Sequence, residues 1–118
     1  MAKCDEGYFC SVCGSDVPDI SVSDLYLRFV AGMIVPEVLH TTPERHIRCN
    51  PIVAQFIVHA EFEPVVVDGD FDKRLLDPAI RESREQLITR SWLRLQELKT
   101  VLRDREMAIT EYPVEPLA

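Results

Sequence analysis

The sequence lacks several features that identify common functional classes. Its 118 residues contain no apolar run approaching the roughly 18 residues that a membrane-spanning helix needs. Its first residues, Met-Ala-Lys-Cys-Asp-Glu, lack the basic and then apolar build of a signal peptide. Internal repeats are absent, as are a glycine-rich phosphate loop, a Gly-x-Ser-x-Gly motif and a His-Glu-x-x-His motif. We therefore expect a cytoplasmic protein with no membrane segment and without the enzyme activities that these motifs mark.

The composition is that of a folded protein with one modest core. Hydrophobic residues make up 47% of the chain and charged residues 28%, a balance typical of globular domains and not of disordered ones. A chain of this length can bury one core, and a bound metal would add to its stability.

Four cysteines stand out in such a short chain. In the cytoplasm cysteines stay reduced, so these four are expected to bind metal or remain free instead of forming disulfides. Cys10 and Cys13 form a Cys-x-x-Cys pair followed by Gly14, and glycine adopts the left-handed conformation that turns the chain beneath a metal ion. This spacing predicts half of a zinc site.

A His-x-x-Cys pair supplies the second half. His46 and Cys49 repeat the same spacing and run into Asn50-Pro51, where Asn suits a helix cap and Pro the first helical position. We therefore expect Cys49 at or just before a helix start, which favours a thiolate. The predicted ligands of one Zn²⁺ ion are Cys10, Cys13, His46 and Cys49.

Two further residues compete for the fourth ligand position. Cys4 could replace His46 to give an all-cysteine site, and His40 is a second contender. Either way, four protein ligands close the coordination shell, whereas catalytic zinc keeps a position for water or substrate. A redox role for Cys10 and Cys13 is disfavoured because no βαβ pattern surrounds them. The expected protein is not an enzyme.

Residues 8–59 resemble the treble-clef and zinc-ribbon class of zinc fingers, through Cys10-x-x-Cys13-Gly14 and His46-x-x-Cys49 at a helix start. The resemblance implies a small zinc-stabilised domain and does not specify a function, because such modules bind nucleic acids or proteins or simply support a fold. The chain departs from the usual pattern by its 32-residue spacer and by His46 in place of a cysteine.

Three shorter segments have readable patterns. Residues 23–31 alternate like a strand, but Ser23 as a cap and Gly32 as a terminator favour a helix. After Pro51, apolar residues recur at helical spacing to about His59, which predicts a short amphipathic helix. The β-branched run 64–67 predicts a short strand closed by a turn.

The longest predicted element begins at Asp77-Pro78, a cap residue followed by a proline, and continues for some 28 residues without Gly or Pro. We expect an α+β, helix-rich protein with a zinc-binding domain at 1–72, this long amphipathic helix within 73–110, and an extended tail at 111–118. The helix would exceed the width of the small domain and pack on it or on a partner. Its apolar stripe predicts a protein partner or a homodimer. That stripe comprises Ile88, Trp92, Leu95, Leu98 and Leu102.

Charge is distributed unevenly along the chain. The net charge is −7, yet residues 73–105 hold nine basic residues against five acidic ones, which makes that segment +4 and leaves −11 elsewhere. We expect a zinc-binding adaptor or subunit of a complex. The alternative is a zinc-finger regulator that binds nucleic acid through the basic helix, which the acidic total disfavours.

Overall fold

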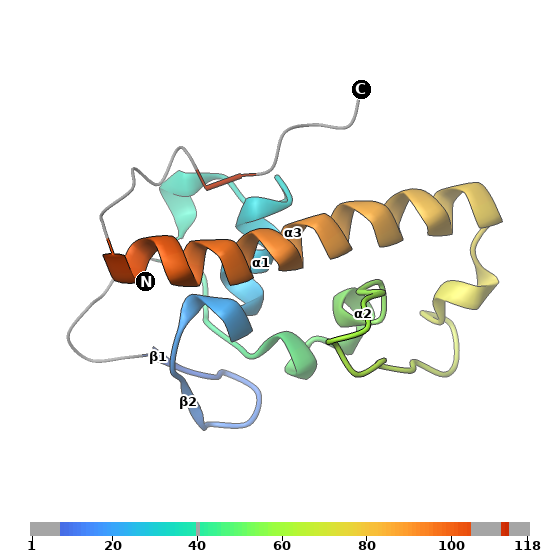
Figure 1. Ribbon diagram of the computed structural model, residues 1–118. Helices are drawn as coiled ribbons and strands as arrows, with labels where there is room; N and C mark the ends of the chain where they lie inside the picture. The colour runs from blue at the N-terminus through green and yellow to red at the C-terminus, as the bar shows by residue number, and fades with distance from the viewer. Residues whose placement is uncertain (1–7, 40, 105–111, 114–118) are drawn as a thin grey trace.

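The computed structural model describes residues 8–39, 41–104 and 112–113, which fold around one hydrophobic core (Figure 1). Within these ranges there are three α-helices, four short 3₁₀ turns and a two-stranded sheet. This content agrees with the predicted helix-rich α+β class. In the same part of the chain, no helix is both long and apolar enough to cross a membrane.

The sheet is a hairpin that presents the first cysteine pair. Strands β1 (Tyr8–Phe9) and β2 (Asp16–Val17) pair antiparallel, with Phe9 opposite Asp16. Gly14 has φ of +77° in the connecting turn, a conformation that a side chain would strain.

Helix α1 (Asp24–Val30) forms the centre of the core, which confirms the prediction of a helix over a strand. The Ser23 hydroxyl accepts the backbone N–H of Tyr26 at 3.1 Å, and Gly32 ends the helix with φ of +83°. Tyr26 and Leu27, adjacent on this helix, are both buried. The alternation in sequence looked like a strand because this helix is buried on nearly all sides.

The segment after the second ligand pair is less helical than predicted. A 3₁₀ turn, η3 (Ile47–Cys49), leads into α2 (Pro51–Ala54), a single turn that stops well before His59. Side chain to backbone hydrogen bonds connect the residues after α2 to later parts of the chain. Gln55 donates to the Phe71 carbonyl at 2.7 Å and accepts from the Lys73 amide at 2.9 Å, while the Thr89 hydroxyl accepts from the Val58 amide at 2.9 Å.

Residues 63–71 form an irregular loop along one side of the molecule. The predicted strand at 64–67 is wrong as a paired strand, because within the described residues the only sheet is β1–β2. A short 3₁₀ turn, η4 (Lys73–Leu75), then leads to the long helix.

Helix α3 (Pro78–Asp104) has 27 residues and spans the molecule, whose longest dimension is 41 Å (Figure 1). The Asp77 carboxylate accepts the Ala79 amide at 2.9 Å, as predicted for its cap. The helix packs on α1 and on η1 (Ile20–Val22), a 3₁₀ turn before α1.

The apolar stripe of α3 is therefore already covered by its own chain. Ile88, Trp92, Leu95 and Leu98 are buried, and Leu102 packs partly buried against the same core. The geometric argument that the stripe outruns the domain was wrong for these residues. The partner itself stays a prediction, which needs another surface.

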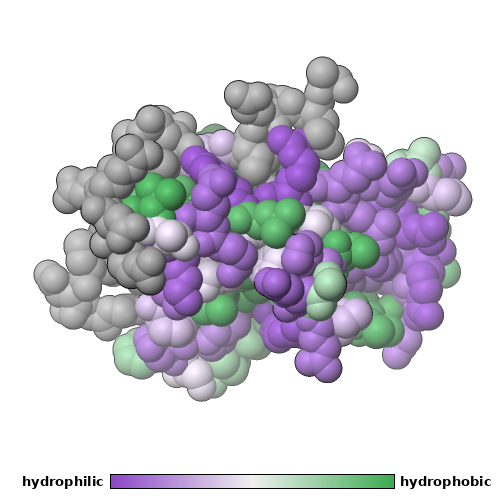
Figure 2. Space-filling view, in the orientation of Figure 1, coloured by the Kyte–Doolittle hydropathy of each residue, from purple (hydrophilic) through white to green (hydrophobic). Residues whose placement is uncertain are grey.

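Tyr112 is buried in the core although it belongs to the predicted tail. Its ring lies 6.2 Å from those of both Tyr26 and Phe29, and its carbonyl accepts Arg94 Nε at 3.0 Å. Of the residues predicted as an extended tail, the described ones are therefore attached to α1 and α3. On the face shown in Figure 2, hydrophobic side chains form small separate areas among polar ones.

Candidate metal centre

The first half of the site is the turn between β1 and β2. Cys10 is buried, and its Sγ accepts backbone N–H groups from Val12 and Cys13 at 3.4 Å and from His46 at 3.5 Å. The Gly14 amide bonds to the Cys10 carbonyl at 2.9 Å and closes the turn. The local backbone thus supplies three donors to one sulfur, an arrangement that stabilises a thiolate.

The second half comes from η3, which brings His46 and Cys49 to the same side. The Cys49 amide donates to the His46 carbonyl at 3.0 Å, so one 3₁₀ turn separates the two side chains. His46 also bridges to Ser23 at the start of α1. The prediction that Cys49 precedes a helix start is confirmed.

The structure brings the four predicted ligands together. The sulfurs of Cys10, Cys13 and Cys49 and a ring nitrogen of His46 all lie within 4.8 Å of one another. In a tetrahedral zinc site with Zn–S bonds of about 2.3 Å, sulfurs lie about 3.8 Å apart, so this cluster fits one ion with small adjustments. Three soft sulfurs and an imidazole are ligands that Zn²⁺ prefers.

His46 is oriented by the hairpin. Its Nε2 lies 2.7 Å from the Asp16 carbonyl, which can only accept, so Nε2 carries the proton in the neutral ring. The unprotonated Nδ1 then points at the sulfurs of Cys13, 3.3 Å away, and Cys49, 3.7 Å away. Backbone carbonyls hold metal-binding histidines in this way, which fixes the tautomer and strengthens the ligand.

The pKa values of the clustered thiols are shifted in opposite directions. Burial opposes ionisation of Cys10, but the donors from Cys13, His46 and Val12 outweigh it and lower its pKa to about 6. Burial and the neighbouring thiols Cys10 and Cys13 raise the pKa of Cys49 to about 11. A bound dication would compensate several thiolates at once.

A buried carboxylate supports the second half of the site, and the sequence analysis missed it. Asp24 is fully buried, accepts Arg28 Nε at 2.8 Å and Arg45 Nε at 2.7 Å, and also accepts Asn50 Nδ2 at 2.9 Å. Arg45 and Asn50 flank the segment 46–49 on either side. Asn50 was predicted to cap α2, but its side chain makes no such bond and holds Asp24 instead.

Glu44 joins this support to the hairpin. Its Oε1 accepts the Ser23 hydroxyl at 2.8 Å and the Arg45 amide at 3.1 Å, and its backbone carbonyl accepts the Ser11 amide at 2.8 Å. In the sequence, the only indication of this support was the charged pair Glu44-Arg45 directly before the candidate ligand His46. Charged residues are normally read as surface groups, so the sequence pattern did not reveal their burial.

A cavity of about 430 Å³ borders the cluster at His46 and Cys49. Among the described residues that line it, Arg48 is the only titratable side chain besides His46 and Cys49, and the remaining walls are mostly apolar or neutral. Those remaining wall residues are Ser21, Val22, Ile47, Phe62, Trp92 and Gln96.

Other candidate ligands are not part of the described cluster. Cys4 and His40, the predicted competitors for the fourth position, lie outside the described residues. His59 packs against the ring of Trp92 with centroids 5.2 Å apart, and its Nδ1 accepts the Glu61 amide. Comparison with protein-family models, with curated proteins and with solved structures found no match.

Proposed function

We propose that this chain is a zinc-stabilised interaction domain, an adaptor or subunit of a complex without catalytic activity of its own. The observation that carries the proposal is the convergence of Cys10, Cys13, His46 and Cys49. One Zn²⁺ ion held by these four groups would have a closed shell, as structural zinc does. A hairpin knuckle combined with a ligand pair before a helix start supports the treble-clef resemblance.

A partner would bind away from the apolar face of α3, because that face is buried. The nucleic-acid alternative is less well supported, since several cations of α3 and η4 are already compensated. Lys73 pairs with Glu85 at 2.6 Å, Lys99 lies 3.4 Å from Asp19, and Arg94 pairs with Glu97. Polyanion binding needs uncompensated positive charge on one face.

Matched substitutions test the metal site. We expect Cys13→Ser and His46→Ala to lower the zinc content of the purified protein well below one ion per chain. Cys4→Ser and His40→Ala are the matched controls and should retain zinc. Loss of zinc in Cys4→Ser with retention in His46→Ala would assign the fourth position to Cys4.

X-ray absorption of the zinc-loaded protein tests the closed shell. Three sulfurs at about 2.3 Å and one nitrogen at about 2.1 Å are expected. A zinc-bound water in place of one protein ligand would contradict the structural role and support an open, catalytic site. Absence of zinc from the protein isolated from its own cells would contradict the whole proposal.

A further inference from the structure

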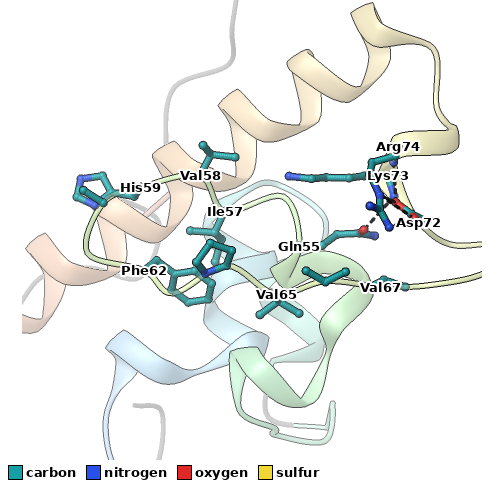
Figure 3. Close-up of a pocket in the computed structure, with 13 residues that line it drawn as sticks. Gln55, Ile57, Val58, His59, Phe62, Val65, Val67, Asp72, Lys73 and Arg74 are labelled. Atoms are coloured by element: carbon teal, nitrogen blue, oxygen red, sulfur yellow. Dashed lines mark hydrogen bonds and ion pairs between the residues drawn. The ribbon is translucent and has the colours of Figure 1, made fainter.

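One segment far from the metal has the character of a strand but no strand partner. In the run 64–68, Val66 is 70% exposed, whereas Val65 and Val67 are partly buried, which is the two-residue period of a strand. Figure 3 shows Val65 and Val67 on one stretch of chain that passes along the pocket. Valine runs favour extended backbone.

The backbone of this stretch is unpaired within the described chain. None of the N–H or C=O groups of Val65, Val66 and Val67 bonds to another described residue, although groups on either side do. The Glu63 carbonyl accepts Arg48 Nη2 at 2.9 Å, and the Gly69 carbonyl accepts the Asp72 amide at 3.2 Å. An extended segment anchored at both ends and open between them offers an edge for strand addition.

A cavity beside this edge can receive side chains. It has a volume of about 460 Å³, with Val65 and Val67 on one side and Ile57 and Phe62 among its other apolar walls (Figure 3). Its polar lining includes Gln55, Asp72, Lys73 and Arg74. A strand added next to residues 65–67 would point every second side chain toward this side of the edge. Apolar side chains at those positions would fill the cavity.

The charges around this edge indicate which kind of peptide could bind there. Glu61, Glu63, Asp68 and Asp70 flank the valines, and the only ion pair that these four make with the described part of the chain is a long one from Asp68 to Arg74 at 3.5 Å. A second copy pairing antiparallel would bring acidic flanks together, which like-charge repulsion disfavours. Lys73 and Arg74, which also line the cavity, are paired with Glu85 and Asp72, so positive charge on the occupant would complement the acidic flanks.

We propose that residues 64–68 form an acceptor edge for an extended peptide of a partner protein, with alternating apolar side chains and lysine or arginine at both ends. This assignment names the partner class for the interaction role proposed above and rests on it. Backbone hydrogen bonds would supply general affinity, and the cavity and the acidic flanks would supply selectivity.

Peptide binding by fluorescence anisotropy tests the proposal on the full-length, zinc-loaded protein. The probe is a fluorescein-labelled peptide in which alternating valines and threonines are flanked by a lysine pair at each end. We expect saturable binding that weakens by about tenfold or more when alternate backbone nitrogens are methylated, because at least two backbone hydrogen bonds are then lost. Replacing the lysines by glutamates should abolish binding.

Variants locate the binding edge. Because successive residues of a strand direct their backbone groups to opposite sides, Val66→Pro or Val67→Pro should weaken binding about tenfold, whereas Val66→Thr, which keeps the N–H, should not. Glu63→Lys with Asp70→Lys should weaken binding, and Glu37→Lys on another element is the charge control. Circular dichroism checks folding, and the methylated peptide tests the wild-type chain if a proline variant misfolds.

Three outcomes would overturn the proposal: the peptide does not bind, the methylated peptide binds as tightly as the unmethylated one, or neither proline variant weakens binding. Self-association that Val66→Pro abolishes would assign the edge to a second copy. The zinc content of the same sample separates the two proposals: a zinc-free protein that binds the peptide contradicts only the metal site, and a zinc-loaded protein that ignores it contradicts only this edge.

Discussion

Asp24 shows how one buried charge connects the core to the metal centre. It sits in the first turn of α1 and holds both Arg45 and Asn50, which bracket the second ligand pair. Buried carboxylates are costly unless each lone pair is used, and Asp24 has three donors. The cluster geometry therefore depends on a residue that touches no sulfur.

Replacing Asp24 by alanine should destabilise the fold and weaken zinc binding together. The substitution leaves Arg28 and Arg45 without their anion, but both arginines are partly exposed and water can solvate them. We therefore expect the free energy of unfolding to fall by about 3 kcal/mol, the low end for a broken buried ion pair. Urea denaturation and competition with a zinc chelator measure the two effects. Asp70→Ala, on the exposed loop, is the control and should change neither. Unchanged zinc affinity in Asp24→Ala would show that the support is not coupled to the site.

Tyr112 predicts how stability changes at alkaline pH. Burial raises the pKa of its phenol above the usual value of about 10, so the folded state favours the neutral form. Its contribution is fully present below the unfolded pKa and is lost as pH rises through the folded pKa. Tyr112→Phe should melt near the wild-type temperature at pH 8 and lose less stability than wild type above pH 10. Parallel decline of both proteins would contradict this.

At the level of elements, the sequence predicted the caps of α1 and α3 but neither the role of Asn50 at α2 nor the absence, among the described residues, of a partner for the predicted strand. Ser23 before α1 and Asp77-Pro78 before α3 are local signals, and both helices begin where these residues predict. The valine run 64–67 has strand propensity, but a strand needs a neighbour, which propensity does not supply. After Gln55 the backbone that follows α2 continues in i→i+3 bonds, from Phe56 to Val53 and from Ile57 to Ala54.

The packing of α3 on its own chain can be tested by substitution. Leu95 is fully buried, whereas Leu93 on the same helix is 42% exposed. Leu95→Ala should lower the free energy of unfolding by about 3 kcal/mol, from lost burial and the cavity left behind. Leu93→Ala should stay within about 0.5 kcal/mol of wild type. Chemical denaturation compares them, and equal costs would place the buried face of α3 elsewhere.

Considered as a whole, the molecule is organised by contacts that connect distant parts of the sequence. The convergence of the four candidate ligands was predictable because Cys-x-x-Cys-Gly and His-x-x-Cys carry their chemistry in local spacing. The covering of the α3 stripe was not, because a sequence pattern shows which face is apolar but not what lies on it. The same holds for Asp24 and Glu44, which look like surface charges until α1 and the hairpin enclose them.

Removal of zinc should therefore unfold the described domain as one unit. The cluster joins the hairpin to η3, η3 packs on α1, and α1 packs on α3, so no element is independent of the site. Binding of structural zinc is worth about 10–16 kcal/mol in small domains, which is comparable to or greater than the total stability of about 5–15 kcal/mol for a folded domain. Adding a strong chelator at pH 7 should abolish most of the helical circular dichroism signal, including that of α3, and excess Zn²⁺ should restore it. Retention of the α3 signal after chelation would show instead that the core of α1 and α3 folds without the metal.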